Sequence, residues 1–183
     1  GEEKSVDNIV QLIKKHQHLG SLYDEQLLSE IDFASSHFNE VIQKNREELK
    51  SLSADTIQRI IINDELRLTN EDELIRFVNE LYSIDRIYSI CYEGVLFENV
   101  TSENICEFIN IYDSNDITRT LWLNISRRLQ REIKKSNSND STDLKGKNRY
   151  CDSKEEEKEE EGIKFSANDD SHFCGIINHL RSQ

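Results

Sequence analysis

Cysteine and histidine side chains near the C-terminus are the residues whose types could bind a metal ion. Cys151, His172, Cys174 and His179 offer thiolate and imidazole groups, which are the ligands that Zn²⁺ prefers. Their spacing, Cys-x20-His-x-Cys-x4-His, matches no standard zinc pattern, and Cys151 lies in a polar stretch. We therefore predict that they bind no metal and that Cys174 packs within a strand-like segment.

Histidines in the N-terminal part could act as general bases, but the sequence provides them with no partner. His16, His18 and His37 lie on predicted helices, without a cysteine or an acidic residue at a characteristic spacing. We expect them on the surface or at helix edges. The sequence also contains no nucleophile motif, no glycine-rich phosphate loop and no paired catalytic carboxylates. We predict a protein that is not an enzyme, with no catalytic residue, no metal and no cofactor.

The basic run RRLQREIKK, residues 127–135, could serve binding. It could contact an acidic partner, or fold back against the glutamates of residues 155–161. It could also be purely structural, because cations near a helix C-terminus are favoured by the helix dipole. We favour the structural interpretation. Trp122 has Leu121 and Ile125 at helical spacing, which predicts a core anchor and not a binding residue.

The composition excludes several classes of partner. The chain has 183 residues and a formal net charge of -13, which repels phosphate backbones and anionic lipid surfaces. We predict no nucleic acid and no membrane partner. No apolar run is long enough to span a bilayer, and the four cysteines lie far apart, which favours reduced thiols and a cytoplasmic protein. Because the chain contains no methionine, we expect it to be a fragment of a longer protein.

Helical periodicity dominates the first two thirds of the chain. Apolar residues recur at helical spacing within residues 5–19, 27–42, 53–61, 70–81, 100–112 and 116–133. Asp116 is predicted to cap the last of these helices. The chain also contains no proline that would interrupt a helix.

Two helix starts carry particularly clear signals. Asn70 is predicted to be an N-cap, and Glu73 is placed to reach back to the N–H of Asn70, which would give a reciprocal capping box. Ser53 is predicted to cap the preceding helix, with Leu52 and Ile57 forming a hydrophobic staple. These signals predict an all-α fold, an array of short antiparallel helical hairpins spanning residues 1–135.

The composition changes after residue 135. Residues 136–162 are polar, and residues 155–161 contain six glutamates and one lysine, so we predict a disordered polar and acidic linker. Apolar residues return in residues 163–183, where Ile163 and Phe165 alternate as in a strand. These last residues are too few to fold alone, and we expect the truncated start of another domain.

The stretch from Phe33 to Val78 resembles the BACK domain, the helical module that follows a BTB domain in many adaptor proteins. The matching features are the HFNEV helix, Leu49 and Leu52, the isoleucine run, Leu66 and Leu68, and the NEDEL segment. The resemblance continues more loosely through Trp122 and covers most of residues 5–135. The family usually has a tryptophan near the end of the NEDEL helix, where this chain has Leu81 and Tyr82. That difference points to a divergent, protist-like branch.

The C-terminal stretch GIKFSANDDSHFCGIINHL is similar to the first strands of a discoidin-like (factor type C) β-sandwich. The BACK resemblance implies a non-catalytic scaffold, a spacer in a BTB-type adaptor that binds protein partners. It further implies an upstream BTB domain that binds a cullin ubiquitin ligase, with residues 5–45 adding contacts beside it. The alternative is a carbohydrate- or surface-recognition protein whose activity lies in a downstream discoidin-like domain. A signal peptide and paired cysteines in the whole gene would favour that alternative.

Overall fold

A computed structural model describes residues 3–19, 23–137 and 149–150. The α-helices are α1 (Ile9–His16), α2 (Asp24–Ser36), α3 (Phe38–Lys44), α4 (Arg46–Leu49), α5 (Ala54–Ile61), α6 (Glu71–Ile84), α7 (Ser102–Ile111) and α8 (Arg119–Asn137). Short 3₁₀ helices are η2 (Arg86–Gly94), η3 (Phe97–Asn99) and η4 (Ser114–Asp116). The described residues contain no strand, so the all-α prediction is confirmed. The predicted β segment 163–183 and most of the predicted linker lie outside the described residues.

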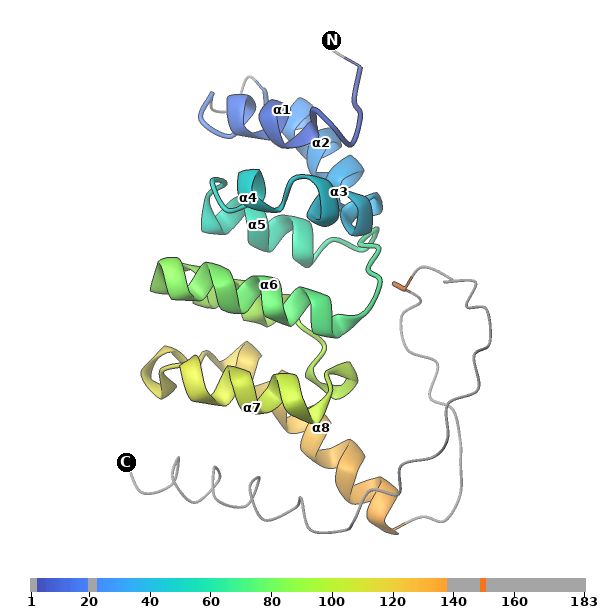
Figure 1. The fold of residues 1–183 in the computed structure, drawn as a ribbon, viewed down its shortest axis with the longest axis vertical. Coiled ribbons are helices and arrows are strands. Elements are labelled where there is room, and N and C mark those ends of the chain that lie inside the picture. The colour runs from blue at the N-terminus through green and yellow to red at the C-terminus, as the bar shows by residue number, and fades with distance from the viewer. Residues whose placement is uncertain (1–2, 20–22, 138–148, 151–183) are drawn as a thin grey trace. The chain divides into compact units, whose positions relative to one another are not determined.

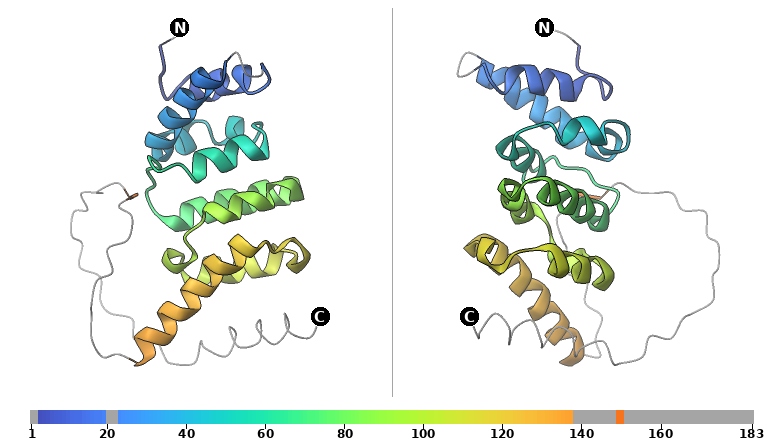
Figure 2. Two further views of the ribbon diagram at one scale, coloured as in Figure 1. Left: turned by 180° about the vertical axis from the view of Figure 1, so that it is seen from behind. Right: turned by 60° about the vertical axis from the view of Figure 1, so that its left-hand side comes forward.

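The helices of the unit Gly1–Asp152 form successive layers (Figures 1 and 2). The first layer holds α1 and α2, the second α3, α4 and α5, the third α6 with η2, and the fourth α7 and α8 with η3. The segment η2 contacts both α5 and α6, while α7 packs on α6. Each layer therefore buries its apolar face against the next, as expected for an array of helices that are individually too short to be stable.

Two predicted helix starts are present in the structure. The side chain of Asn70 accepts a 2.8 Å hydrogen bond from the N–H of Glu73, and Ser53 Oγ accepts one of 3.3 Å from Thr56. Leu52 and Ile57 are both buried, as the staple requires. The described contacts of Asn70 do not include the reciprocal bond to the Glu73 carboxylate. The capping box is therefore only half formed.

The helix predicted over residues 27–42 is interrupted at His37, where α2 ends and α3 begins. The connection before α6 supplies the physical reason. Arg67 N–H donates to the Ser35 carbonyl at 2.9 Å, and Asn39 N–H donates to the Arg67 carbonyl at 3.1 Å. These two long-range bonds replace helical ones, so a contact distant in sequence divides the predicted helix. The first helix is also shorter than predicted, because α1 covers only Ile9–His16 of residues 5–19.

An aromatic cluster fills the core between the third and fourth layers. Tyr92 lies at its centre, with ring centroids 4.9 Å from Phe108 and 5.1 Å from Tyr112. Phe97 contacts Phe108 from η3 at 5.0 Å, and the buried Tyr92 hydroxyl donates to Asn79 Oδ1 at 2.7 Å. The segment η2 thus supplies a central core residue from a stretch that the helical period did not reveal.

Candidate protein-interaction site

A buried histidine pairs with a buried carboxylate between the first two helices. His16 was expected at the surface or at a helix edge, but it is buried, and its Nδ1 lies 2.8 Å from the carboxylate of the buried Glu30. This pair joins α1 to α2, and the ring of Tyr23 stacks on His16 at 5.4 Å. Sequence reasoning missed it because a spacing of 14 residues across a helix connection has no characteristic signature. The pair connects α1 to α2, and its described contacts include no nucleophile.

The structure describes Cys91 and Cys106, which differ in burial. Burial raises the pKa of Cys91 to about 12, so its thiol stays protonated and a poor nucleophile at neutral pH. Cys106 is a free, exposed cysteine. Across the described part of the chain, no cluster of three or more histidines, cysteines and carboxylates could hold a metal. The zinc candidates Cys151, His172, Cys174 and His179 lie outside the described residues.

A carboxylate on α6 receives two cations from the second layer. Arg46 Nη2 is 2.6 Å and Lys50 Nζ 2.9 Å from the carboxylate oxygens of Glu80. The guanidinium of Arg46 also lies over the ring of Phe77, 5.3 Å from its centroid. The hydrogen bond from Arg46 lowers the pKa of Glu80, and Lys50 adds to the effect. The group therefore stays ionised and links α4 and the residue after it to α6.

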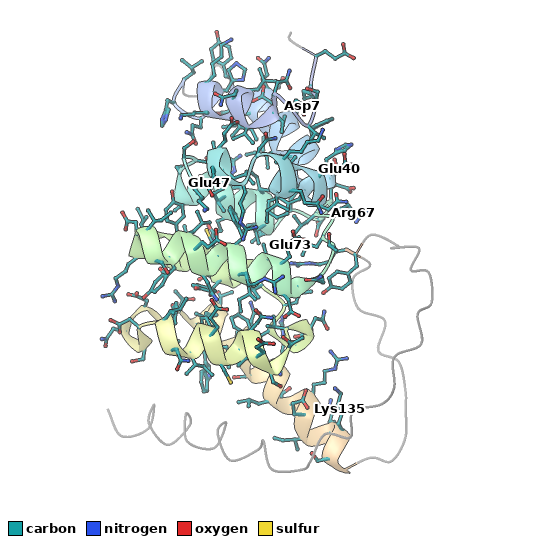
Figure 3. The ribbon with its side chains drawn as sticks, in the orientation of Figure 1. Asp7, Glu40, Glu47, Arg67, Glu73 and Lys135 are labelled. Carbon is teal, nitrogen blue, oxygen red and sulfur yellow. The ribbon has the colours of Figure 1, made fainter. Side chains whose placement is uncertain are left out.

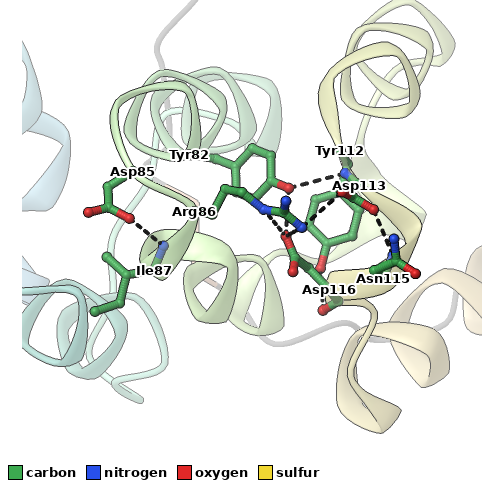
Figure 4. Close-up of polar contacts among 8 residues, drawn as sticks. All are labelled: Tyr82, Asp85, Arg86, Ile87, Tyr112, Asp113, Asn115 and Asp116. Atoms are coloured by element: carbon green, nitrogen blue, oxygen red, sulfur yellow. Dashed lines mark hydrogen bonds and ion pairs between the residues drawn. The ribbon is translucent and has the colours of Figure 1, made fainter.

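A second polar cluster joins the end of α6 to the turn before α8 (Figure 4). Tyr82 Oη donates to Asp116 Oδ2 at 2.7 Å, and Arg86 Nη2 lies 2.9 Å from both Asp116 and Asp113. Tyr112 Oη donates to the carbonyl of Asp116 at 2.6 Å. Asp116 was predicted to cap α8, but α8 begins at Arg119. The carboxylate of Asp116 is used between layers instead.

The buried face of α8 differs from the predicted one. It consists of Leu121, Asn124 and Arg128, and the two polar residues donate to backbone carbonyls. Arg128 donates to Phe97 O at 2.9 Å and also to Val100 O, while Lys134 and Lys135 lie in the last turn of α8, where the structural interpretation of the basic run 127–135 places cations. Trp122 was predicted to be a core anchor, yet it is 40% exposed. The hydrogen bonds of Asn124 and Arg128 orient α8 so that Trp122 faces outward.

The first layer carries an exposed apolar group. Leu19 and Leu28 are each 47% exposed and Tyr23 is 39% exposed; Leu19 and Tyr23 belong to the connection between α1 and α2, and Leu28 lies on α2. We call these three residues the N-terminal apolar patch. Acidic side chains such as Asp7, Glu40 and Glu47 lie exposed elsewhere on the first two layers (Figure 3).

A comparison with protein families found one match within this chain. Residues 21–105 match the BACK family, described as BTB And C-terminal Kelch. The match begins before α2 and ends within α7, and it supports the predicted BACK resemblance for residues 21–105. No curated protein and no solved structure matches the chain. The divergent branch and the discoidin-like C-terminus remain predictions, and the residues of the latter lie outside the described ones.

None of the helices in the described part has both the length and the apolar character needed to cross a bilayer.

Proposed function

We propose that this chain is a non-catalytic protein-interaction scaffold, the BACK-type spacer of a BTB adaptor that serves a cullin ubiquitin ligase in the cytoplasm. The match of residues 21–105 to the BACK family carries this proposal. The layered helices support it, because buried contacts between neighbouring layers make a stiff support that holds two partners at a set distance.

Polar contacts between the layers explain how such a spacer would couple the positions of its two ends. Glu80 links the second layer to the third through Arg46, and Asp116 links the third to the fourth through Tyr82. Charge-assisted bonds of this kind have narrow geometry and resist sliding of one helix over another. A rotation at one end of the stack would therefore be passed to the other end.

The N-terminal apolar patch is the surface that we assign to the cullin. Leu19, Tyr23 and Leu28 lie within residues 5–45, the part expected beside an upstream BTB domain, and their exposed apolar area would be buried by a partner. The alternative function, recognition of a carbohydrate or a surface through a discoidin-like domain, rests on residues 163–183, and no described contact favours it.

A pull-down tests the proposal. The BTB domain expected upstream of Gly1 is compared alone and joined to residues 1–183 for recovery of a cullin N-terminal domain. We expect the joined protein to recover more cullin, and Leu28→Asp to remove the gain. Ile84→Asp is the matched control, because Ile84 is equally apolar and 63% exposed but lies at the end of α6. Equal recovery from both proteins, or an equal loss with Ile84→Asp, would contradict the ubiquitin-ligase role.

A further inference from the structure

A dipeptide distant in sequence pairs with the connection before α6. The N–H of Leu68 donates to the carbonyl of Arg149 at 2.8 Å, and Leu68 and Tyr150 form an isolated parallel β-bridge. Backbone pairing of this kind adds one extended segment to another and places no demand on side-chain identity. Leu68 thus presents a backbone edge to which an extended peptide can bind.

The side chain of Arg149 enters a site that is built for a cation. Its Nη2 lies 2.9 Å from Oε1 of Glu71 and 3.3 Å from the carbonyl of Gly94. Glu71 is 1% exposed and Arg149 is 9% exposed. A buried carboxylate is costly unless a cation and further donors compensate its charge, so Glu71 makes this position selective for a positive side chain.

Tyr150 shares the Glu71 carboxylate with Arg149 and adds a contact to Asn99. Its hydroxyl donates to Oε2 of Glu71 at 2.9 Å and accepts a 2.8 Å bond from Asn99 Nδ2. The N–H of Leu96 donates to Oε1 of the same carboxylate at 2.7 Å. We call Leu68, Glu71, Gly94, Leu96 and Asn99 the Glu71 cradle. Its contacts engage the guanidinium group of Arg149 and the hydroxyl group of Tyr150.

The cradle is not filled as tightly as an ordinary core. Nε of Arg149 is buried and has no hydrogen-bond partner among the described residues. A cavity of about 440 Å³ borders Arg149, and its wall includes the acidic residues Asp64 and Glu93. There is room and negative charge beside the dipeptide for neighbouring residues of a basic segment. The net charge of -13 favours the approach of such a segment.

We propose that the Glu71 cradle is a recognition site for an extended basic peptide carrying arginine followed by tyrosine, and that Arg149–Tyr150 occupies it within this chain. A partner protein with such a segment binds by displacing the internal dipeptide. Because Arg149–Tyr150 belongs to the same chain, it competes at a high effective concentration. A partner segment must therefore bind the cradle tightly enough to displace it. This inference does not depend on the cullin or BTB assignments.

Fluorescence anisotropy with a labelled peptide tests the site. The probe has the sequence of residues 145–153 with Cys151→Ser, and it is titrated into the full chain and into the full chain with Arg149→Ala and Tyr150→Ala. We expect about tenfold or greater tightening with the double variant, because its cradle is vacant. A probe that carries Arg149→Ala should not bind either chain. Arg149→Lys in the chain is a milder change and should tighten probe binding to an intermediate extent. This variant tests the site if the double variant does not fold.

The role of the Glu71 charge is tested in the vacated chain, the full chain with Arg149→Ala and Tyr150→Ala. Glu71→Gln should weaken probe binding by about tenfold or more, because the charge-assisted bonds to arginine are lost. Glu73→Gln is the matched control, on the same turn of α6 and outside the cradle, and should leave binding unchanged. Circular dichroism confirms that each variant is folded. Equal affinity of the probe for the wild-type and vacated chains, or equal binding of both probes, would overturn the proposal and leave Arg149–Tyr150 as a purely internal contact.

Discussion

The hydroxyl of Tyr82 lies 2.7 Å from the carboxylate of Asp116, and this bond joins α6 to the turn before α8. The same hydroxyl accepts a hydrogen bond from the N–H of Asp113 at 3.1 Å. The Tyr82 hydroxyl therefore has two hydrogen-bond partners and a structural role.

Tyr82→Phe should lower the free energy of unfolding by about 1 to 2 kcal/mol, because Asp116 and the N–H of Asp113 lose their shared partner. Urea unfolding followed by circular dichroism measures the change. Tyr23→Phe is the control, since Tyr23 is 39% exposed and should change stability by less than about 0.5 kcal/mol. Equal effects of the two substitutions would show that the Tyr82 hydroxyl does not join the layers.

Asn70→Ala should lower stability by about 1 kcal/mol, because the bond from the Glu73 N–H to the Asn70 side chain is lost. Glu73→Ala should cost less than about 0.5 kcal/mol, since its side chain does not close the capping box and contributes only through the helix dipole. Midpoints of urea unfolding separate the two cases. A cost for Glu73→Ala as large as that for Asn70→Ala would indicate a complete capping box in solution.

Gly94→Ala should destabilise the unit by about 1 to 3 kcal/mol, because a Cβ atom at this position would overlap the Cγ2 atom of the buried Ile61. The combination with Ile61→Ala should cost less than the sum of the two single changes, since the truncated side chain makes room for the new methyl group. A double-mutant cycle in urea measures this coupling. Strict additivity would show that Gly94 is not in close contact with Ile61.

Arg128→Ala should destabilise the unit by about 2 to 4 kcal/mol, because the buried Phe97 and Val100 would lose the donor to their carbonyls. Arg127→Ala is the neighbouring control and should cost less than about 0.5 kcal/mol, since Arg127 is exposed. Thermal unfolding of the two variants gives the comparison. If both had the small effect, α8 would be held by apolar contacts alone.

Glu80→Gln should lower stability at pH 7 by about 0.5 to 1 kcal/mol, the range for solvent-screened ion pairs. The pKa of Glu80 in the folded protein is below its usual value of 4.5, mainly because of Arg46. The ionised carboxylate thus stabilises the folded state above pH 4.5, and this contribution is lost as the pH falls through the lowered pKa. The difference between the two proteins should shrink on acidification. A difference that is constant from pH 7 to pH 3 would contradict this assignment.

The sequence by itself determined the all-α class and several helix starts. Asn70 and Ser53 could be assigned because an N-cap is a local interaction between residues three positions apart. The apolar stripes from Leu74 to Leu81 and from Ile57 to Ile61 also appear as buried faces, since helical spacing places them on one side. The BACK resemblance rests on the same local features.

The tertiary structure alone decided how polar groups are paired across long distances in sequence. His16 is buried because Glu30 lies on a neighbouring helix. The interruption at His37 follows from pairing with Arg67, and Trp122 is exposed because Asn124 and Arg128 orient α8. The pairing of Glu71 with Arg149, 78 residues apart, likewise has no local signal. A buried polar side chain needs a partner wherever the fold supplies one, and that partner is determined by the packing of the layers and not by spacing along the chain.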